Sequence, residues 1–173
     1  KSLAVGTGSS KISCEVMTDQ SIPYNFSKSD FLVAEKTSVS PTIDAIPLVF
    51  KHKLAEIRIE LLPGTGFDSL EELSAINPTV SIKGAATQAV YDIESRTFAE
   101  QTNVSDIIPA GEFSISSGKL QGKRAIVVPQ EIEGDKLFVE VKAGGKSYSF
   151  TFGEKHIIVP STIETYTLTI KRA

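Results

Sequence analysis

The stretch LVFKHKLAEIRIELL, residues 48–62, decides how the chain must fold. Its bulky side chains stand at even positions from Leu48 to Leu54 and at odd positions from Ala55 onward. Side chains of a β-strand alternate between two faces, so an apolar set changes parity only at a β-bulge or where the strand passes from one sheet to another. We therefore predict a bulge or a corner between two sheets near Lys53–Ala55.

Alternation of apolar and polar residues, interrupted by turn residues, continues along most of the chain. In the last such segment, TYTLTIK, it would place Tyr166, Leu168 and Ile170 inward and the threonines outward. The pair Gly144-Gly145 indicates a hairpin turn between two strands. Further strands are predicted at residues 11–16, 79–84, 88–94, 112–116 and 124–130.

Only one helix is expected, over about residues 69–75. Asp68 followed three residues later by Glu71 fits a capping box, and the leucines between and after them share one face. Many strands with a single helical crossover predict an all-β sandwich. The proline-bearing loop EKTSVSPTIDAIP, residues 35–47, is the best candidate for a linker or domain edge.

The side chains available for catalysis or metal binding are few. The net charge is −3 and the charges are interspersed, so no basic face is available for nucleic acid. His52 and His156 are the only histidines, and we expect both to be hydrogen-bonded structural residues, because no cluster of three or four convergent ligands accompanies them. Cys14 shares a strand face with Ile12 and Val16, which predicts a buried, inert thiol. We predict no catalytic residue, cofactor or metal.

Four parts of the chain resemble, in order and spacing, segments of the fimbrillin family, the Mfa-like surface proteins and pilus subunits of Bacteroidales. TDQSIPYNFSKSDFLVAE looks like its D-Q-S, polar loop and S-D-L-hydrophobic-A strand, and PLVFKHKLAEIRIELLPGTGFD looks like its F-x-H-x-L-A/S-K-I stretch. RAIVVPQEI matches its I-hydrophobic-P-Q element. KLFVEVKAGGKSYSFTF and ETYTLTIKRA are similar to its closing hairpin and terminal strand.

This resemblance implies transthyretin-like, antiparallel β-sandwich domains in a protein exported to the cell surface and outer membrane as a lipoprotein. It implies that residues 1–44 are the end of an N-terminal β-domain and that residues 45–173 are a C-terminal β-sandwich domain. The expected function is that of a structural or adhesive fimbrial protein, not an enzyme. Its partners would be other fimbrial subunits or host surface ligands, and it would contact a membrane only through a lipid anchor that this chain does not carry.

We expect partners to bind along a sheet edge, by strand pairing between subunits as the resemblance implies. The first and last strands lie at the chain ends, where a strand can be gained or released without threading a loop. The last strand has no charge or proline from Tyr166 to Ile170, so its exposed edge would invite association. We expect that edge to be covered by the first strand or by another subunit. The candidate strand-exchange residues are Ile12, Cys14, Val16, Tyr166, Leu168 and Ile170.

The alternative function is a surface-displayed module that binds carbohydrate or a host ligand. It would be favoured if Tyr24, Phe26 and Tyr91 cluster on one exposed face. Asp68-Ser69-Leu70 also resembles the O-glycosylation acceptor of Bacteroidetes, which makes Ser69 a candidate site, although Asp68 is already expected to cap the helix. Two N-glycosylation sequons begin at Asn25 and Asn103.

Overall fold

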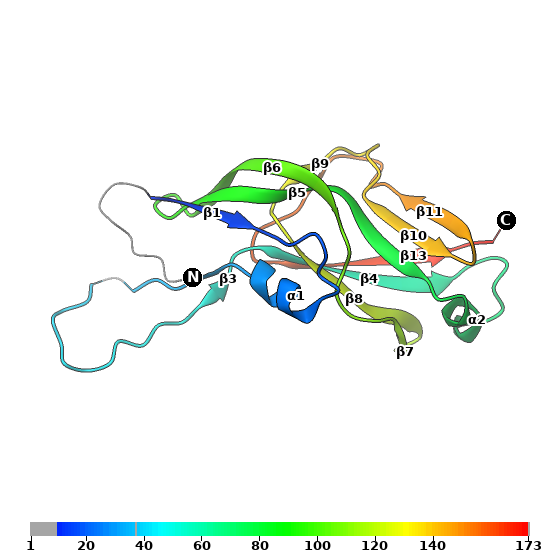
Figure 1. The fold of residues 1–173 in the computed structure, drawn as a ribbon, viewed down its shortest axis with the longest axis horizontal. Coiled ribbons are helices and arrows are strands. Elements are labelled where there is room, and N and C mark those ends of the chain that lie inside the picture. Colours follow the sequence, from blue (N-terminus) through cyan, green and yellow to red (C-terminus); the bar gives the residue numbers. More distant parts are fainter. Residues whose placement is uncertain (1–9, 37, 173) are drawn as a thin grey trace.

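The computed structural model describes residues 10–36 and 38–172. Figure 1 shows an elongated body whose longer strands run in two layers along the long axis. The predicted all-β sandwich is confirmed, whereas its transthyretin-like detail stays a prediction.

The first layer is a five-stranded antiparallel sheet built on its longest strand, β5. β6 pairs with one side of β5, while β10 pairs with the beginning and β1 with the end of the other side. β11 follows β10 through the turn at Gly144-Gly145, where both glycines have positive φ, so the predicted hairpin is confirmed. The strands are β1 (Lys11–Glu15), β5 (Thr79–Asp92), β6 (Thr97–Ile107), β10 (Val139–Ala143) and β11 (Lys146–Phe150).

The second layer is a four-stranded sheet in the order β13-β4-β8-β7. β13 runs parallel to β4, and the other pairs are antiparallel. Two further pairs, β2 with β3 and β9 with β12, are short. The bounds are β4 (Ala55–Pro63), β7 (Ser114–Ser116), β8 (Lys119–Val127), β13 (Ile163–Ile170), β2 (Leu32–Val33), β3 (Lys51–His52), β9 (Glu131–Ile132) and β12 (His156–Ile157).

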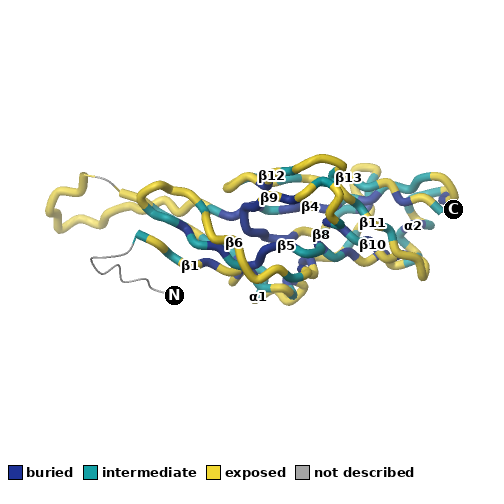
Figure 2. The backbone as a smooth tube through the Cα atoms, turned by 90° about the horizontal axis from the view of Figure 1, so that it is seen from above, coloured by how far each residue is buried: buried dark blue, intermediate teal, exposed yellow. Residues whose placement is uncertain are grey.

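The hydrophobic core lies between the two layers, where the buried segments concentrate in Figure 2. Ala55, Ile57, Ile59 and Leu61 are all buried, as the odd-numbered alternation of β4 requires. They belong to one cluster with apolar side chains of β5, β8 and β10. Full burial of such an aliphatic side chain is worth about 1.5–3 kcal/mol, which makes this contact between the layers the main source of stability.

The parity change in residues 48–62 is a passage between sheets. β3 pairs with β2, whereas β4 pairs with β8 and β13 in the four-stranded sheet. Leu54 lies between β3 and β4 and outside both. It is buried, and its carbonyl oxygen accepts a hydrogen bond from the Ser161 amide at 3.1 Å. The corner predicted near Lys53–Ala55 is confirmed.

Two helices are present in the described residues, so the prediction of a single helix is wrong. α1 (Pro23–Ser29) begins with proline at its first position and carries no apolar period that would announce it. α2 (Leu70–Ala75) is the predicted helix, with Leu73 buried in the core. Its cap is shifted by one residue, because the Ser69 hydroxyl accepts from the Glu72 amide at 3.2 Å. The Glu72 carboxylate accepts from the backbone amide of Asp68, so Asp68 is not the capping side chain.

β6 is the longest strand that the alternation pattern does not predict. Nearly all its side chains are exposed and only Ile107 is buried, so the strand carries no apolar period. Glu100 and Asn103 adopt positive φ, and the register with β5 shifts along the strand. The predicted segments 79–84 and 88–94 are parts of one strand, β5.

The described residues before position 44 pack on the same core as those after it. β1 pairs with β5, and Cys14 and Val16 belong to the common apolar cluster. Gln20 is fully buried, and its side-chain amide both donates to the Ile126 carbonyl (2.7 Å) and accepts from the Ile126 amide (2.8 Å). The boundary between residues 1–44 and 45–173 stays a prediction.

Candidate functional site

The outer edge of β13 is the candidate interaction site. Among the described strands, β13 pairs only with β4, so its other side is open. Ile170 is buried and Tyr166 and Leu168 are half-buried against the core, while the intervening threonines are exposed. The sequence therefore predicts correctly which residues of this strand face inward.

The direction of the backbone groups follows from the hydrogen bonds to β4. The carbonyls of Thr162 and Ile170, both at even positions, accept from the amides of Glu56 in β4 and of Gly64, the residue after β4. The N–H and C=O of one strand residue point to the same side, and those of the next residue point to the opposite side. The odd residues of β13 therefore direct their backbone groups to the open edge. These are Ile163, Thr165, Thr167 and Thr169.

The β13 edge is the longest uninterrupted edge in the described part of the chain. Its eight residues pair with β4 without a register shift, and none of them has positive φ. The open side of β6 is longer but is disrupted at Glu100 and Asn103. The outer strands β7 and β11 have 3 and 5 residues. Bulges and short lengths are the usual means of protecting an edge from association, and β13 uses neither.

A polar cluster flanks the first half of β13 on its inner face. His156 Nε2 lies 2.8 Å from a Glu164 carboxylate oxygen, which also accepts a 2.5 Å hydrogen bond from the Tyr166 hydroxyl. The His156 ring stacks on Phe152 with 4.1 Å between centroids. Burial and the neighbouring Glu164 carboxylate raise the pKa of Tyr166 far above its ordinary value, so the phenol stays protonated and donates. His156 is thus a hydrogen-bonded residue that ties β12 to β13.

On the outer face, three side chains join β13, β4 and β8. The Glu60 carboxylate accepts from Lys119 Nζ at 2.6 Å and from the Thr167 hydroxyl at 2.9 Å. The hydrogen bond from Lys119 holds the pKa of Glu60 below its ordinary value. Side chains on both faces of β13 therefore make hydrogen bonds to other parts of the fold. Only the outer edge of β13, on the side away from β4, has no partner strand in the described residues.

The first strand does not cover this edge. Cys14 of β1 pairs with Ala89 of β5 in the other sheet, and its thiol donates to the Ala89 carbonyl at 3.4 Å. Burial raises the pKa of the Cys14 thiol, as expected for an inert cysteine. The structure therefore does not bring Ile12, Cys14 and Val16 together with the β13 residues. The first strand, one of the two segments expected to cover the β13 edge, is paired with β5 instead.

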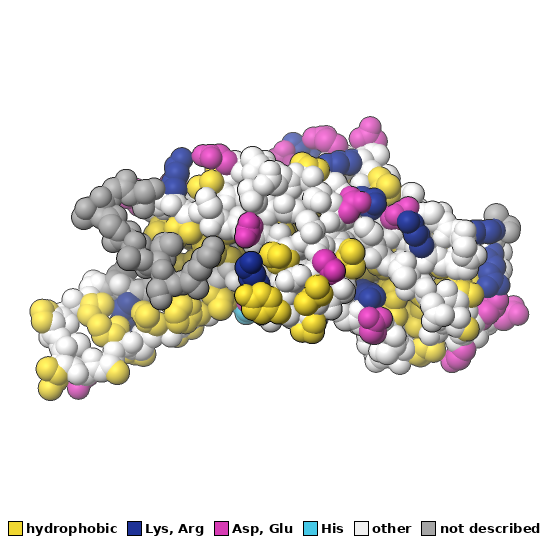
Figure 3. All heavy atoms as spheres, viewed as in Figure 1, with side chains coloured by type: hydrophobic (Ala, Val, Ile, Leu, Met, Phe, Trp, Pro, Cys, Tyr) yellow, Lys and Arg dark blue, Asp and Glu magenta, His cyan; other side chains and the backbone are white. Residues whose placement is uncertain are grey.

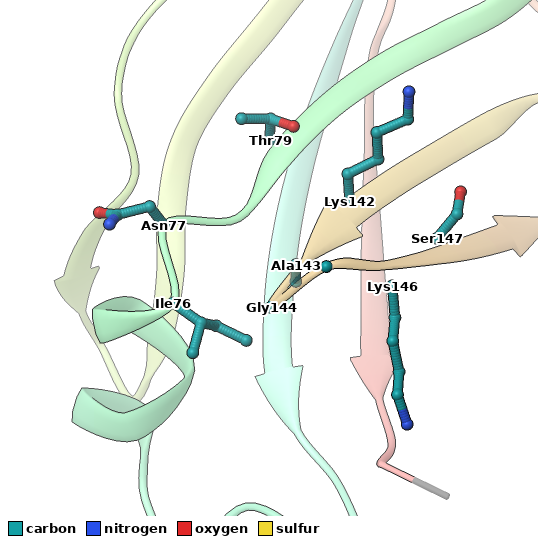
Figure 4. Close-up of a pocket in the computed structure, with 9 residues that line it drawn as sticks. Ile76, Asn77, Thr79, Lys142, Ala143, Gly144, Lys146 and Ser147 are labelled. Atoms are coloured by element: carbon teal, nitrogen blue, oxygen red, sulfur yellow. The ribbon is translucent and has the colours of Figure 1, made fainter.

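A shallow cavity of about 400 Å³ lies between α2 and the β10–β11 turn. Figure 4 shows Lys142 and Lys146 extending from it in opposite directions, while Ile76 points toward the turn. The two lysine side chains therefore do not converge on one point of the cavity.

The remaining sequence candidates lie apart from β13. Tyr24 is exposed, Phe26 lies beneath the Arg124 guanidinium at 4.6 Å, and Tyr91 is fully buried. The exposed aromatic cluster that would favour a ligand-binding module is therefore not formed. His52 Nδ1 donates a hydrogen bond to the Asp30 carboxylate at 2.9 Å, as expected for a structural histidine. Glycosylation of Ser69 stays a prediction.

Across residues 10–36 and 38–172, no group of three or more His, Cys, Asp or Glu residues is arranged to hold a metal ion. The helices in this part of the chain are too short or too polar to cross a bilayer.

The fold is that of two solved all-β proteins from Bacteroides, each described as a "putative cell adhesion protein". The one from Bacteroides uniformis ATCC 8492 has a TM-score of 0.68 and 19% identity, over 96% of this chain and 63% of that chain. The one from Bacteroides ovatus ATCC 8483 has a TM-score of 0.65 and 14% identity, over 95% and 57%. This likeness concerns the fold, and the chain spans less than two thirds of either protein. No curated protein matches it.

The sequence defines the relationship more closely. The model of the fimbrillin-like family matches residues 3–173, nearly the whole chain. The chain belongs to the fimbrillin-like family.

Proposed function

We propose that the protein is a structural or adhesive subunit of a cell-surface fimbria that assembles with neighbouring subunits by strand pairing at the open edge of β13. Family membership supports the fimbrial role and a non-enzymatic one. The observation that carries the assembly mode is the uninterrupted edge of β13, whose outward backbone groups have no partner in the described residues.

An added strand would satisfy groups that the fold leaves open. Four residues present outward N–H and C=O groups, and each backbone hydrogen bond is worth about 0.5–1.5 kcal/mol net. Alternate side chains of the added strand would lie beside Leu168 on the inner face and beside the threonines on the outer face. This is β-augmentation, in which the main chain provides affinity and the side chains provide specificity.

Proline at Thr165 tests this edge directly. Proline removes one N–H and is tolerated at an edge where that N–H faces solvent, so Thr165→Pro should leave the β4–β13 ladder intact. Thr165→Val is the matched control, because valine keeps the amide and suits a strand. We expect light scattering to show concentration-dependent association of the wild type and of Thr165→Val, and weaker association of Thr165→Pro. Equal association of all three, with unchanged circular dichroism, would show that the edge is not the site.

Export and anchoring at the outer membrane belong to the same proposal. The family supports a cell-surface location, and other fimbrial subunits or host ligands are the partners that follow from it. Labelling of intact cells with a membrane-impermeant amine reagent should modify the exposed lysines of this protein. Labelling only after lysis would place it inside the cell.

A further inference from the structure

An apolar loop projects beyond the two sheets, between β2 and β3. We call residues 39–50, VSPTIDAIPLVF, the apolar loop. Every residue in it is exposed, and the largest exposed fractions of its apolar residues are 104% for Ile43, 73% for Val49 and 60% for Phe50. In the space-filling view, apolar side chains gather along this projection at one end of the long axis (Figure 3). Contiguous exposure of large apolar side chains marks a surface that binds a protein or a membrane.

The apolar loop is poorly suited to a strand ladder. Pro41 and Pro47 have no N–H, so a strand paired along the loop would lack donors at two positions. Within the described residues no backbone hydrogen bond joins the loop to another segment, and the Thr42 hydroxyl bonds only within the loop, to Asp44. The apolar side chains are therefore available to a partner that requires no strand register, and a lipid surface is such a partner.

Lysines lie at the base of the loop on both sides. Lys36 precedes the loop and Lys51 follows it. The pairing of β2 with β3 holds the two sides of the base together, with Val33 opposite Lys51. Both lysines are exposed, and neither forms an ion pair in the part of the chain that the structure describes. A lysine near an anionic membrane surface strengthens binding, and here two of them lie directly behind an apolar projection.

The carboxylates nearest to these lysines in the sequence are already paired. Glu35 lies 2.7 Å from an Arg96 guanidinium nitrogen, and Asp30 lies 2.9 Å from His52. Asp44 is the single acidic residue of the loop itself. The whole chain has a net charge of −3, but charges more than about 8 Å apart are largely screened at physiological salt. An anionic surface that approaches this end of the molecule therefore meets chiefly the two lysines.

We propose that the apolar loop inserts its side chains into the surface of a lipid bilayer with anionic headgroups, while the lysines at its base contact those headgroups. The loop projects from the end of the long axis opposite the C-terminus, so the body of the protein does not obstruct its approach (Figure 1). Unpaired backbone groups and a carboxylate are costly in hydrocarbon, so the backbone and Asp44 stay at headgroup depth, where water solvates them. This site is separate from the proposed fimbrial assembly, and it adds a contact made by the protein itself to the lipid anchor that the sequence resemblance implies.

A tryptophan placed in the loop measures insertion. The chain contains no tryptophan, so the fluorescence of Phe50→Trp reports on the loop alone. With mixed phosphatidylcholine–phosphatidylglycerol vesicles we expect its emission to shift to shorter wavelength and to be quenched by lipids brominated on the acyl chain. Val104→Trp is the matched control, because Val104 is 65% exposed on β6, outside the loop, and its emission should not change. Unchanged emission of Phe50→Trp would overturn the inference.

Two matched valines test the apolar contribution. Val49 in the loop and Val104 on β6 are exposed at 73% and 65%, so the fold should tolerate serine at either position. Burial of one valine side chain contributes about a factor of ten to binding. In flotation with the mixed vesicles we therefore expect Val49→Ser to bind about tenfold more weakly than the wild type and Val104→Ser to bind equally well. Equal binding of both variants would show that the loop does not insert.

The lysines test the headgroup contact. One lysine near an anionic surface contributes about fivefold to binding, so Lys51→Gln should bind the mixed vesicles about fivefold more weakly. Lys146→Gln is the control, because Lys146 is exposed at the start of β11, far from the loop in the sequence, and its loss should have no effect. On vesicles of phosphatidylcholine alone, the wild type and Lys51→Gln should bind equally and weakly. Equal binding of the wild type to both kinds of vesicle would refute the role of anionic headgroups.

A second copy of the chain is the competing occupant of the loop. If the wild type does not bind vesicles and Val49→Ser weakens self-association in light scattering, the loop is a protein contact and the inference is overturned. Thr165→Pro should bind vesicles as the wild type does, because Thr165 lies in β13 and outside the loop. Lipid binding and fimbrial assembly are thus decided by separate results. Loss of vesicle binding in Thr165→Pro, with unchanged circular dichroism, would assign the lipid contact to β13 and overturn the inference.

Discussion

Replacement of Gln20 by leucine probes how the segment before β2 is held to the sheet. The buried Gln20 amide pairs with both backbone groups of Ile126, at 2.7 and 2.8 Å, and so takes the place of a neighbouring strand. Gln20→Leu keeps the shape but leaves that N–H and C=O unsatisfied, at about 1–3 kcal/mol each. The mid-range total is about 4 kcal/mol, and the better burial of leucine offsets roughly 1 kcal/mol. We expect the free energy of unfolding to fall by about 3 kcal/mol.

Urea unfolding followed by circular dichroism measures this loss, with the slope of the transition checked for constancy between variants. Gln88→Leu is the control, because the Gln88 amide is at the surface and makes a single 3.4 Å hydrogen bond to Glu15. Its loss should be within about 0.5 kcal/mol. A loss below about 1 kcal/mol for Gln20→Leu would mean that Ile126 finds other partners and that the amide does not substitute for a strand.

Three further outcomes are expected. The Cys14 thiol should resist a thiol-specific reagent at pH 8 in the folded protein and react when urea unfolds it, because burial raises its pKa; rapid labelling of the folded state would contradict this. Lys119→Met should destabilise the fold at pH 7, and the difference from the wild type should shrink as the pH falls below 4.5. The reason is that a folded-state pKa of Glu60 below its ordinary 4.5 contributes stability that is lost as the pH falls through the folded value; a difference independent of pH would refute the pairing. Gly145→Ala should cost about 1 kcal/mol in urea unfolding, because φ is +77° although nothing lies within 4 Å of the added methyl, and an unchanged midpoint would show that the turn relaxes.

The parts of the fold that sequence reasoning predicts are those with a strong period. The parity change at Leu54 and Ala55 predicts a passage between sheets because the burial of β4 requires it. The Gly144-Gly145 turn is predicted because positive φ at both positions suits glycine. β6 and α1 are missed for the opposite reason, since an exposed strand and a short helix held by polar contacts leave no apolar period. In α1 the Ser29 hydroxyl accepts from the Met17 amide at 2.9 Å, a contact that no local pattern announces.

The candidate site is likewise predicted only in part from the sequence. The uncharged run from Tyr166 to Ile170 is visible in the sequence and marks an edge that lacks protection. Its neighbours are not visible there, because pairing is a long-range property: β13 pairs in parallel with β4, more than 100 residues earlier in the chain, while β1 is taken up by β5. A strand edge is open when no other strand pairs with it, and the strand pairings are known only from the three-dimensional structure.

The segment before the corner at Leu54 shows the same limit of sequence patterns. The even-numbered side chains of residues 48–54 look in the sequence like one buried face, yet Leu48 and Phe50 are exposed and only Leu54 is buried. Before the corner only Lys51 and His52 form a strand, β3, and residues 45–50 form none. Apolar alternation therefore predicts the buried face of β4 correctly but not the exposure of Leu48 and Phe50, because burial depends on which other segments pack against a strand and not on its own pattern alone.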